Sequence, residues 1–147
     1  MRRASNVKKK SRTIWQRRSA TVTVDVPFHD LDGLQVVWHG HYYKYFECAR
    51  TVFSRALGFD VSQMKRSGYL WPVIETHCRY IAPITYGMKV RVQAKLADVL
   101  HRVKFVYTIT DAKTGRRLAI GHTVQAAVHA KSGDLCLMTP RFFLRHL

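Results

Sequence analysis

Two aspartates stand two positions apart, at Asp30 and Asp32, shortly before the triplet His39-Gly40-His41. Only 9 of the 147 residues are acidic, so this pairing is unusual for the chain. A carboxylate can attack a carbonyl carbon as a nucleophile or take a proton from water as a general base. It can also shape a loop through an Asx turn. We favour the loop-shaping role for Asp30, whereas the pattern alone leaves Asp32 open between the two roles.

A long amphipathic helix is predicted to begin directly after these residues. Apolar residues recur at spacings of three and four from Tyr42 to Leu57, and Gly58 suits the helix end. No Ser, Thr, Asp or Asn precedes this helix to cap the N–H groups of its first turn. Gly40 would let another molecule approach the backbone. These N–H groups could stabilise an oxyanion on a substrate carbonyl, although water or a distant side chain could cap them instead.

The histidines and cysteines do not form a recognisable metal site. His39 and His41 lack a ligand spacing such as His-Glu-x-x-His, and the three cysteines, at Cys48, Cys78 and Cys136, contain no Cys-x-x-Cys pair. The chain also lacks a Gly-x-Ser-x-Gly elbow and a glycine-rich phosphate loop. We therefore expect no metal and no cofactor. Without a secretory signal or a membrane-spanning apolar run, we expect a cytoplasmic protein with reduced thiols.

The charge of the chain is strongly positive. The 25 basic and 9 acidic residues give a net charge of +16, and residues 1–18 hold eight of the basic residues and no acidic one. We interpret residues 1–18 as a disordered, solvated arm, while contact of this arm with nucleic acid or an anionic membrane stays open. Residues 19–147 are expected to form one domain, whose remaining charge of +8 suits a polyanionic ligand.

The rest of the chain has a β pattern. The expected strands span residues 21–26, 71–81, 88–96, 103–109 and 118–130, with a short helix at 61–66 and a last short strand after 131–134. Gly115 is expected in a left-handed turn position. One long helix with this many antiparallel strands predicts an α+β fold in which a single curved sheet wraps around the helix.

The segment "HDLDGLQVVWHGHYYKYFECART" (residues 29–51) resembles the signature of the hot-dog-fold acyl-CoA thioesterases, in particular the 4-hydroxybenzoyl-CoA thioesterase-like family. The matching residues are Asp30, Asp32, Val36, Val37, Trp38, His39, Tyr42, Phe46, Glu47, Ala49 and Arg50. The segment "RYIAPITYGMKVRVQAKL" (residues 79–96) resembles a second conserved stretch of the family. The resemblance covers about residues 20–140, and its hot-dog fold agrees with the element order predicted above.

The resemblance implies a reaction and roles for several residues. Asp32 matches the catalytic carboxylate, and the backbone N–H at or beside His39 matches the donor that polarises the thioester carbonyl, with the His39 side chain also in the active site. The candidates for substrate contact are Trp38, Gly40, Tyr42 and Glu47, with the apolar segment 69–73 as a further candidate for the acyl slot. Gln35 and His41 depart from the family pattern, and these departures concern the shape of the substrate more than the chemistry.

Other functions stay open from the sequence. Glu47 with His39 would fit a hot-dog dehydratase, and the carrier of the acyl group could be an acyl carrier protein instead of coenzyme A. A non-catalytic protein that binds an acyl group or an anion is also compatible with the fold. Because a half-wrapped sheet leaves an open edge strand, as in hot-dog relatives that pair these edges, we expect a homodimer or homotetramer with the active site near the subunit interface.

Overall fold

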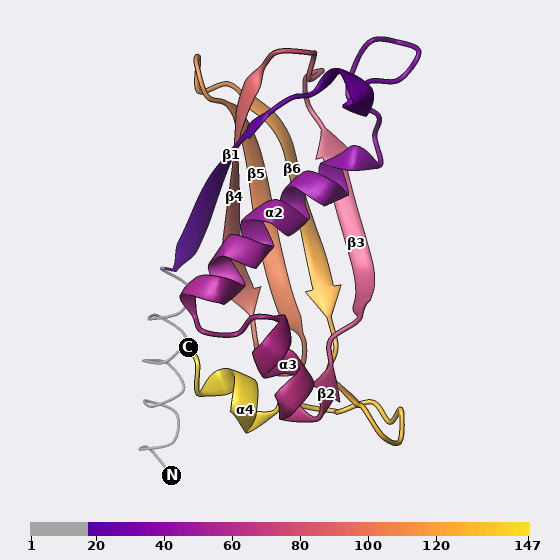
Figure 1. Cartoon of the computed structure of the whole chain (residues 1–147), viewed down its shortest axis with the longest axis vertical. Coiled ribbons are helices and arrows are strands. Elements are labelled where there is room, and N and C mark those ends of the chain that lie inside the picture. Colours follow the sequence, from indigo (N-terminus) through magenta and orange to yellow (C-terminus); the bar gives the residue numbers. More distant parts are fainter. Residues whose placement is uncertain (1–17) are drawn as a thin grey trace.

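The computed structural model describes residues 18–147, in which an antiparallel five-stranded sheet wraps around one long helix (Figure 1). The elements are β1 (Ser19–Asp25), η1 (Phe28–Asp30), α2 (His41–Ala56), α3 (Val61–Ser67), β2 (Tyr69–Leu70), β3 (Val73–Tyr80), β4 (Lys89–Asp98), β5 (Val103–Asp111), β6 (Arg117–Gln125), β7 (Val128–His129) and α4 (Arg141–Leu144). The predicted α+β fold is confirmed. The basic arm proposed for residues 1–18 lies, except for its last residue, outside the described part of the chain.

The main sheet has the strand order β1-β4-β5-β6-β3. Its centre is a meander of β4, β5 and β6. The predicted alternation is confirmed in β4, in which the residues between the buried ones face outward; the buried residues are Val90, Val92, Ala94 and Leu96. The apolar face of β5 alternates in the same way, because one face of an antiparallel sheet packs on the core while the other meets solvent.

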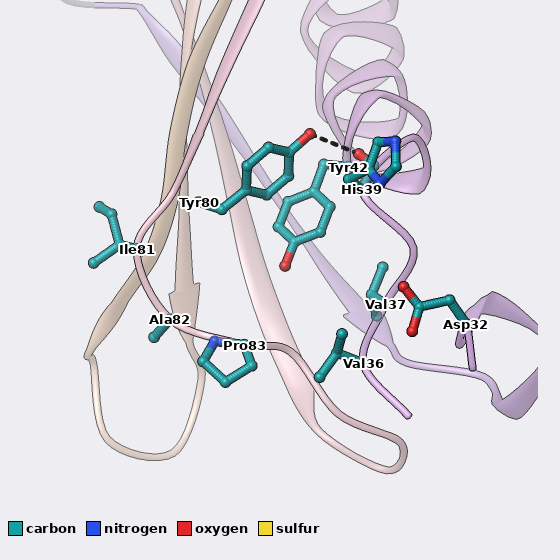
Figure 2. A pocket seen from close by; sticks show the side chains of 9 residues that line it. All are labelled: Asp32, Val36, Val37, His39, Tyr42, Tyr80, Ile81, Ala82 and Pro83. Carbon is teal, nitrogen blue, oxygen red and sulfur yellow. Dashed lines mark hydrogen bonds between the residues drawn. The ribbon is translucent and has the colours of Figure 1, made fainter. Parts of the chain in front are cut away.

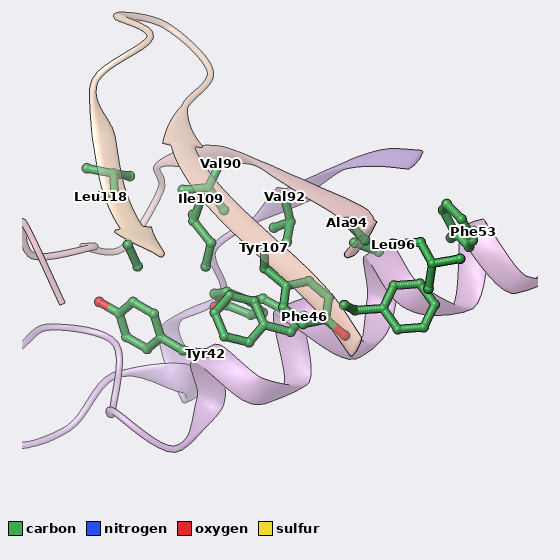
Figure 3. Close-up of a cluster of buried hydrophobic side chains, with 14 of the residues drawn as sticks. Tyr42, Phe46, Phe53, Val90, Val92, Ala94, Leu96, Tyr107, Ile109 and Leu118 are labelled. Atoms are coloured by element: carbon green, nitrogen blue, oxygen red, sulfur yellow. The ribbon is translucent and has the colours of Figure 1, made fainter. Parts of the chain in front are cut away.

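Helix α2 packs across this apolar face (Figure 3). Its buried residues are Tyr42, Tyr45, Phe46, Ala49 and Phe53. The ring of Phe46 stacks on the ring of Tyr107 in β5, with centroids 4.4 Å apart and planes 10° from parallel. Gly121 in β6 makes room for this stack, because a Cβ atom there would lie 2.6 Å from the Phe46 ring.

Several predicted boundaries were wrong. The strand expected at 71–81 is shorter and forms β3 (Val73–Tyr80). Trp71 and Pro72 separate β3 from the two-residue β2, and Pro72 has no N–H to donate to a ladder. The strand expected at 118–130 ends at Gln125 and resumes only as β7. The expected last strand is a single bridge between Val128 and Leu135, and the chain then forms the unpredicted α4, whose Phe143 packs against Phe59.

Strand β3 lies at one edge of the sheet. Among residues 18–147 it pairs only with β6, and seven of its eight residues are exposed, with Cys78 half-buried. Cys48, Cys78 and Cys136 are all free thiols. Among residues 18–147, no helix is long and apolar enough to cross a membrane.

Candidate active site

A pocket of about 360 Å³ lies where the segment before α2 meets the end of β3 (Figure 2). Its lining residues are Asp32, Val36, Val37, His39, Tyr42, Tyr80, Ile81, Ala82 and Pro83. Three residues predicted for the site, Asp32, His39 and Tyr42, are thus brought together. Residues 32–42 form one wall of the pocket. Residues 80–83 form the other wall and come from a segment about 40 residues further along the chain than the start of α2.

Asp32 is held in place by the turn that follows it. Its N–H donates to the carbonyl of Val36 at 2.9 Å, and its carbonyl accepts from the N–H of Gln35 at 2.9 Å. One carboxylate oxygen, Oδ1, accepts the N–H of Leu34 at 2.8 Å, which is the geometry of an Asx turn. The other oxygen, Oδ2, has no hydrogen-bond partner among residues 18–147, so it is available to a ligand in the pocket.

Asp30 has a different environment, because its carboxylate is buried. It accepts hydrogen bonds from the Tyr45 hydroxyl at 2.7 Å and from the Lys44 ammonium, and its carbonyl accepts the Trp38 N–H at 2.9 Å. Burial acts to raise the pKa of Asp30, but these side-chain hydrogen bonds and the charges of Lys44 and His41 outweigh it and leave the pKa below its ordinary value. Asp30 therefore shapes the loop as a buried anchor to α2, and not through the Asx turn that we considered for it.

Among residues 18–147, no side chain caps the start of α2, which is one of the possibilities that the sequence left open. The residue before the helix is Gly40, with helical backbone angles and no capping hydrogen bond from its neighbours. Within the described residues, the N–H groups of His39 and Gly40 have no hydrogen-bond acceptor. Of these two residues, His39 lines the pocket, so its N–H group is available to a ligand oxygen.

Tyr80 connects β3 to this helix start. Its hydroxyl donates to the carbonyl of His39 at 2.9 Å (Figure 2), and its ring meets the Tyr42 ring edge-to-face at 4.7 Å. Burial, with a smaller effect of the neighbouring Cys78, raises the pKa of Tyr80 to about 12, so the hydroxyl stays protonated and able to donate. The hydrogen bond restrains the backbone of the segment that carries the free N–H groups.

Three predicted substrate contacts do not line the pocket. Gly40 leaves room for an internal side chain and not for a ligand, because a Cβ atom there would lie 2.2 Å from the Trp38 ring. Trp38 itself packs beside His39 and lies outside the pocket lining. Glu47 projects from α2 with 60% of its side chain exposed, and it pairs with Arg50. The dehydratase arrangement of Glu47 with His39 therefore has no support in the pocket geometry.

The apolar segment 69–73, the further candidate for the acyl slot, does not line this pocket. Trp71 packs against Phe59 and Phe143 in the core near α3 and α4, at the opposite end of the sheet. The wall that the sequence reasoning missed is formed by Tyr80, Ile81, Ala82 and Pro83. Its sequence signals were the Ala-Pro pair at the end of a predicted strand and the resemblance of residues 79–96 to a second conserved stretch of the family. Neither signal shows what the strand faces.

Among residues 18–147, no group of three or more His, Cys, Asp or Glu side chains could hold a metal ion. The chemistry available in the pocket is that of one carboxylate oxygen, one imidazole and backbone N–H donors in an otherwise apolar and aromatic lining. A carboxylate can act on a carbonyl carbon or on water, and backbone donors stabilise an oxyanion.

Comparison with known proteins gives three findings on relatives. The family model described as "Thioesterase-like superfamily" matches residues 26–144. A protein of Aquifex aeolicus (strain VF5) named "Putative esterase" is 30% identical over 110 residues, which are 75% of this chain and 84% of that protein. Two solved structures share the fold. A 1,4-dihydroxy-2-naphthoyl-CoA thioesterase from Synechocystis has a TM-score of 0.79 at 18% identity, over 88% of this chain and 95% of its own. A 4-hydroxybenzoyl-CoA thioesterase complexed with 4-hydroxybenzoyl-CoA has a TM-score of 0.77 at 12% identity, over 88% and 98%.

Proposed function

Because the chain belongs to the thioesterase-like superfamily, we propose that it hydrolyses acyl-CoA thioesters in the pocket at the start of α2, with Asp32 as the catalytic carboxylate. The reaction class, hydrolysis of a CoA thioester, is that of the family and of the acyl-CoA thioesterases that share this hot-dog fold. The observation that supports the choice of residues is that Asp32 and the uncapped start of α2 line one pocket.

Asp32 supplies the group that begins the reaction. Its Oδ2 atom either attacks the thioester carbonyl carbon or removes a proton from a water molecule that attacks it. In both routes the C–S bond breaks and the sulfur leaves as the thiolate of coenzyme A. In the first route the acyl group is then held on Asp32 as a mixed anhydride, which water hydrolyses to the free acid; in the second route the attacking water gives the free acid directly. The Asx turn to Leu34 fixes the carboxylate, so little conformational freedom is lost when the substrate binds.

The backbone beside His39 supplies the second element. As the carbonyl oxygen gains negative charge, the free N–H group of His39 donates to it, and the positive end of the α2 dipole favours that charge. Tyr42 and the apolar wall of residues 80–83 form the slot for the acyl group. The His39 ring lines the same pocket and completes the polar side of the site.

Two further features belong to this proposal. The unpaired edge of β3 supports a homodimer, or a tetramer built from such dimers, with the pocket near the subunit interface. The net charge of +16 suits the phosphates of coenzyme A, and it also suits an acidic acyl carrier protein. The free cysteines agree with a cytoplasmic location.

The test is the activity of the Asp32→Asn variant on a panel of acyl-CoA and acyl-carrier-protein thioesters. Hydrolysis is measured by the release of the free thiol. The amide keeps the volume of the side chain but is neither nucleophile nor base, so kcat should fall at least ~10²-fold while the substrate still binds. Asp25→Asn, on the exposed outer face of β1, is the matched control and should keep wild-type activity. Turnover near the wild-type rate by a folded Asp32→Asn protein would refute the assignment.

A further inference from the structure

A second cavity lies on the outer face of the sheet, at the start of β4. Its volume is about 770 Å³, against about 360 Å³ for the candidate active site. The start of β4 and the hairpin between β5 and β6 lie at the same end of the sheet, and both contribute to the lining (Figure 1). The lining residues that carry the argument are Thr23, Tyr86, Lys89, Arg91, Asp111 and Lys113. We call this cavity the basic groove.

The basic groove opens away from α2. Lys89 and Arg91 are exposed and alternate along β4 with the buried Val90 and Val92, which belong to the core beneath the helix. Successive side chains of a strand point to opposite faces of the sheet, so the two cations face outward. The groove is therefore a site apart from the pocket at the start of α2.

Positive charge gathers in and beside the groove. Lys89, Arg91 and Lys113 line it. Arg91 pairs with Thr110 of β5, which pairs in turn with Arg117 of β6, so the two arginines stand in one cross-strand row. Because neighbouring strands are ~4.8 Å apart, the Cα atoms of the two arginines are about 10 Å apart. Their guanidinium groups can thus hold a phosphorylated ligand from two sides.

Two acidic side chains near the groove do not cancel this charge. Asp111 accepts the N–H of Lys113 at 2.8 Å, and this bond is the main cause that lowers the pKa of Asp111, so its carboxylate is charged and shapes the turn. Asp25 pairs with Lys89 at 3.0 Å. The four cations minus these two acids leave a net charge of +2 around the groove. A ligand with two or more negative charges matches this balance.

An aromatic side chain forms one wall of the groove. Tyr86 is 63% exposed, and its ring meets the ring of Phe28, which is 73% exposed, edge-to-face with centroids 5.7 Å apart. The contact with Phe28 restrains the orientation of the Tyr86 ring. A restrained and exposed ring offers a surface on which a flat base can stack.

We propose that the basic groove binds a nucleotide, with its phosphates on Arg91 and the neighbouring lysines and its base on Tyr86. An inorganic anion would leave the aromatic wall unused, whereas an uncharged aromatic compound would leave the cations without a partner. Side chains hold the phosphates here, in place of the glycine-rich loop that the sequence lacks. The inference does not depend on the proposed function, because the groove contains no residue of the pocket.

The nucleotide has two possible sources, which are a free nucleotide and the nucleotide end of a coenzyme A thioester held in the pocket. Pro83 lines the pocket and Tyr86 lines the groove, so both sites flank one loop. Three residues span at most about 11 Å between their Cα atoms. The pantetheine arm of coenzyme A can cross such a distance, and the experiment must therefore separate the two sources.

Calorimetric titration of the full-length protein with ADP and with inorganic pyrophosphate tests the proposal. The wild-type protein should bind ADP in the micromolar range. Arg91→Gln should weaken both ligands at least about tenfold, because charged hydrogen bonds to phosphate are lost. Tyr86→Ala should weaken ADP at least about fivefold and leave pyrophosphate unchanged, because only the base uses the ring. Lys95→Gln removes a charge from the same face of β4 outside the groove, and as the matched control it should bind both ligands like the wild-type protein.

Steady-state hydrolysis of acyl-CoA separates the two sources. If the nucleotide is that of coenzyme A, Arg91→Gln should raise KM and leave kcat unchanged; if it is a free nucleotide, both constants should stay at their wild-type values. Three results would overturn the inference: no binding of ADP to the wild-type protein, an equal loss in Lys95→Gln and Arg91→Gln, or unchanged ADP binding in Tyr86→Ala. A wild-type protein that hydrolyses no acyl-CoA would overturn the proposed function alone, and the titrations would still decide the inference.

Discussion

Replacing Asp30 by Asn tests the buried anchor that joins the loop carrying Asp32 to α2. The amide oxygen of Asn can still accept the Tyr45 hydroxyl, but the negative charge is lost and an NH₂ group is placed near the Lys44 ammonium. The buried network then has two donors facing each other. We expect the variant to fold but to be less stable than the wild-type protein.

The magnitude follows from the exposure of the partners. Breaking a fully buried ion pair costs about 3–5 kcal/mol, because the remaining charge is left without a partner. Here 47% of the Lys44 side chain is exposed, so its ammonium can return to water and recover much of its solvation. What remains is the loss of hydrogen bonds to a charged acceptor, about 1.5–3 kcal/mol. We therefore expect a loss of about 2 kcal/mol in the free energy of unfolding, or roughly 8 °C in Tm for a chain of this size.

The loss should depend on pH with a defined sign. Because the pKa of Asp30 is lowered in the folded protein, its charge contributes stability above the unfolded pKa of about 3.9, and this contribution disappears as the pH falls through the folded value. Urea unfolding of both proteins should thus show the full difference at pH 7 and a shrinking difference below about pH 4. Asp25→Asn, in an exposed pair with Lys89, is the control and should change little at any pH.

Two results would refute this reasoning. Equal stability of the wild-type and Asp30→Asn proteins at pH 7 would mean that the anchor contributes nothing. An undiminished difference well below the folded pKa would mean that the charge of Asp30 is not the cause. Activity is a separate readout: the variant should lose less turnover than Asp32→Asn, because Asp30 does not line the pocket.

Two more substitutions test other parts of the structure. Tyr80→Phe removes the hydrogen bond to the His39 carbonyl. Because such a bond is worth about 1 kcal/mol, we expect kcat to fall about fivefold in steady-state kinetics, with little change in KM or Tm. An unchanged kcat would contradict a positioning role for Tyr80. Gly121→Ala places a methyl group against the Phe46 ring and the His77 carbonyl. We expect this variant to be less stable by about 1–3 kcal/mol in urea unfolding. Unchanged stability would show that the surrounding residues relax freely around the methyl group.

The sequence predicts those features that depend on neighbouring residues. The alternation in β4 and most of the apolar stripe of α2 were predicted correctly, because each element buries one face and its period is visible locally. Val52 and Ala56, which the period also assigned to the stripe, are exposed. Asp32, His39 and Tyr42 were found together because one continuous motif carries them.

Features that depend on distant contacts were not predicted. Tyr80 enters the pocket because β3 pairs with β6 in one particular register, and nothing near Tyr80 in the sequence specifies that register. The anchoring role of Asp30 depends on Tyr45, which reaches it only after α2 has packed. The helix α4 forms because Phe143 packs against Phe59 and Trp71. This is a tertiary contact, which the helix propensity of residues 141–144 does not indicate.

The strand order has a consequence for synthesis on the ribosome. Strand β3 begins at Val73, but its only partner in the main sheet, β6, begins at Arg117. At 5–20 residues per second, β3 waits roughly 2 to 9 seconds for that partner to be made. The meander of β4, β5 and β6 can assemble from local hairpins as it emerges, whereas β3 joins it by a long-range closure. The pocket wall and the proposed dimer edge, which lie on the same strand, are therefore completed in the same late step of folding.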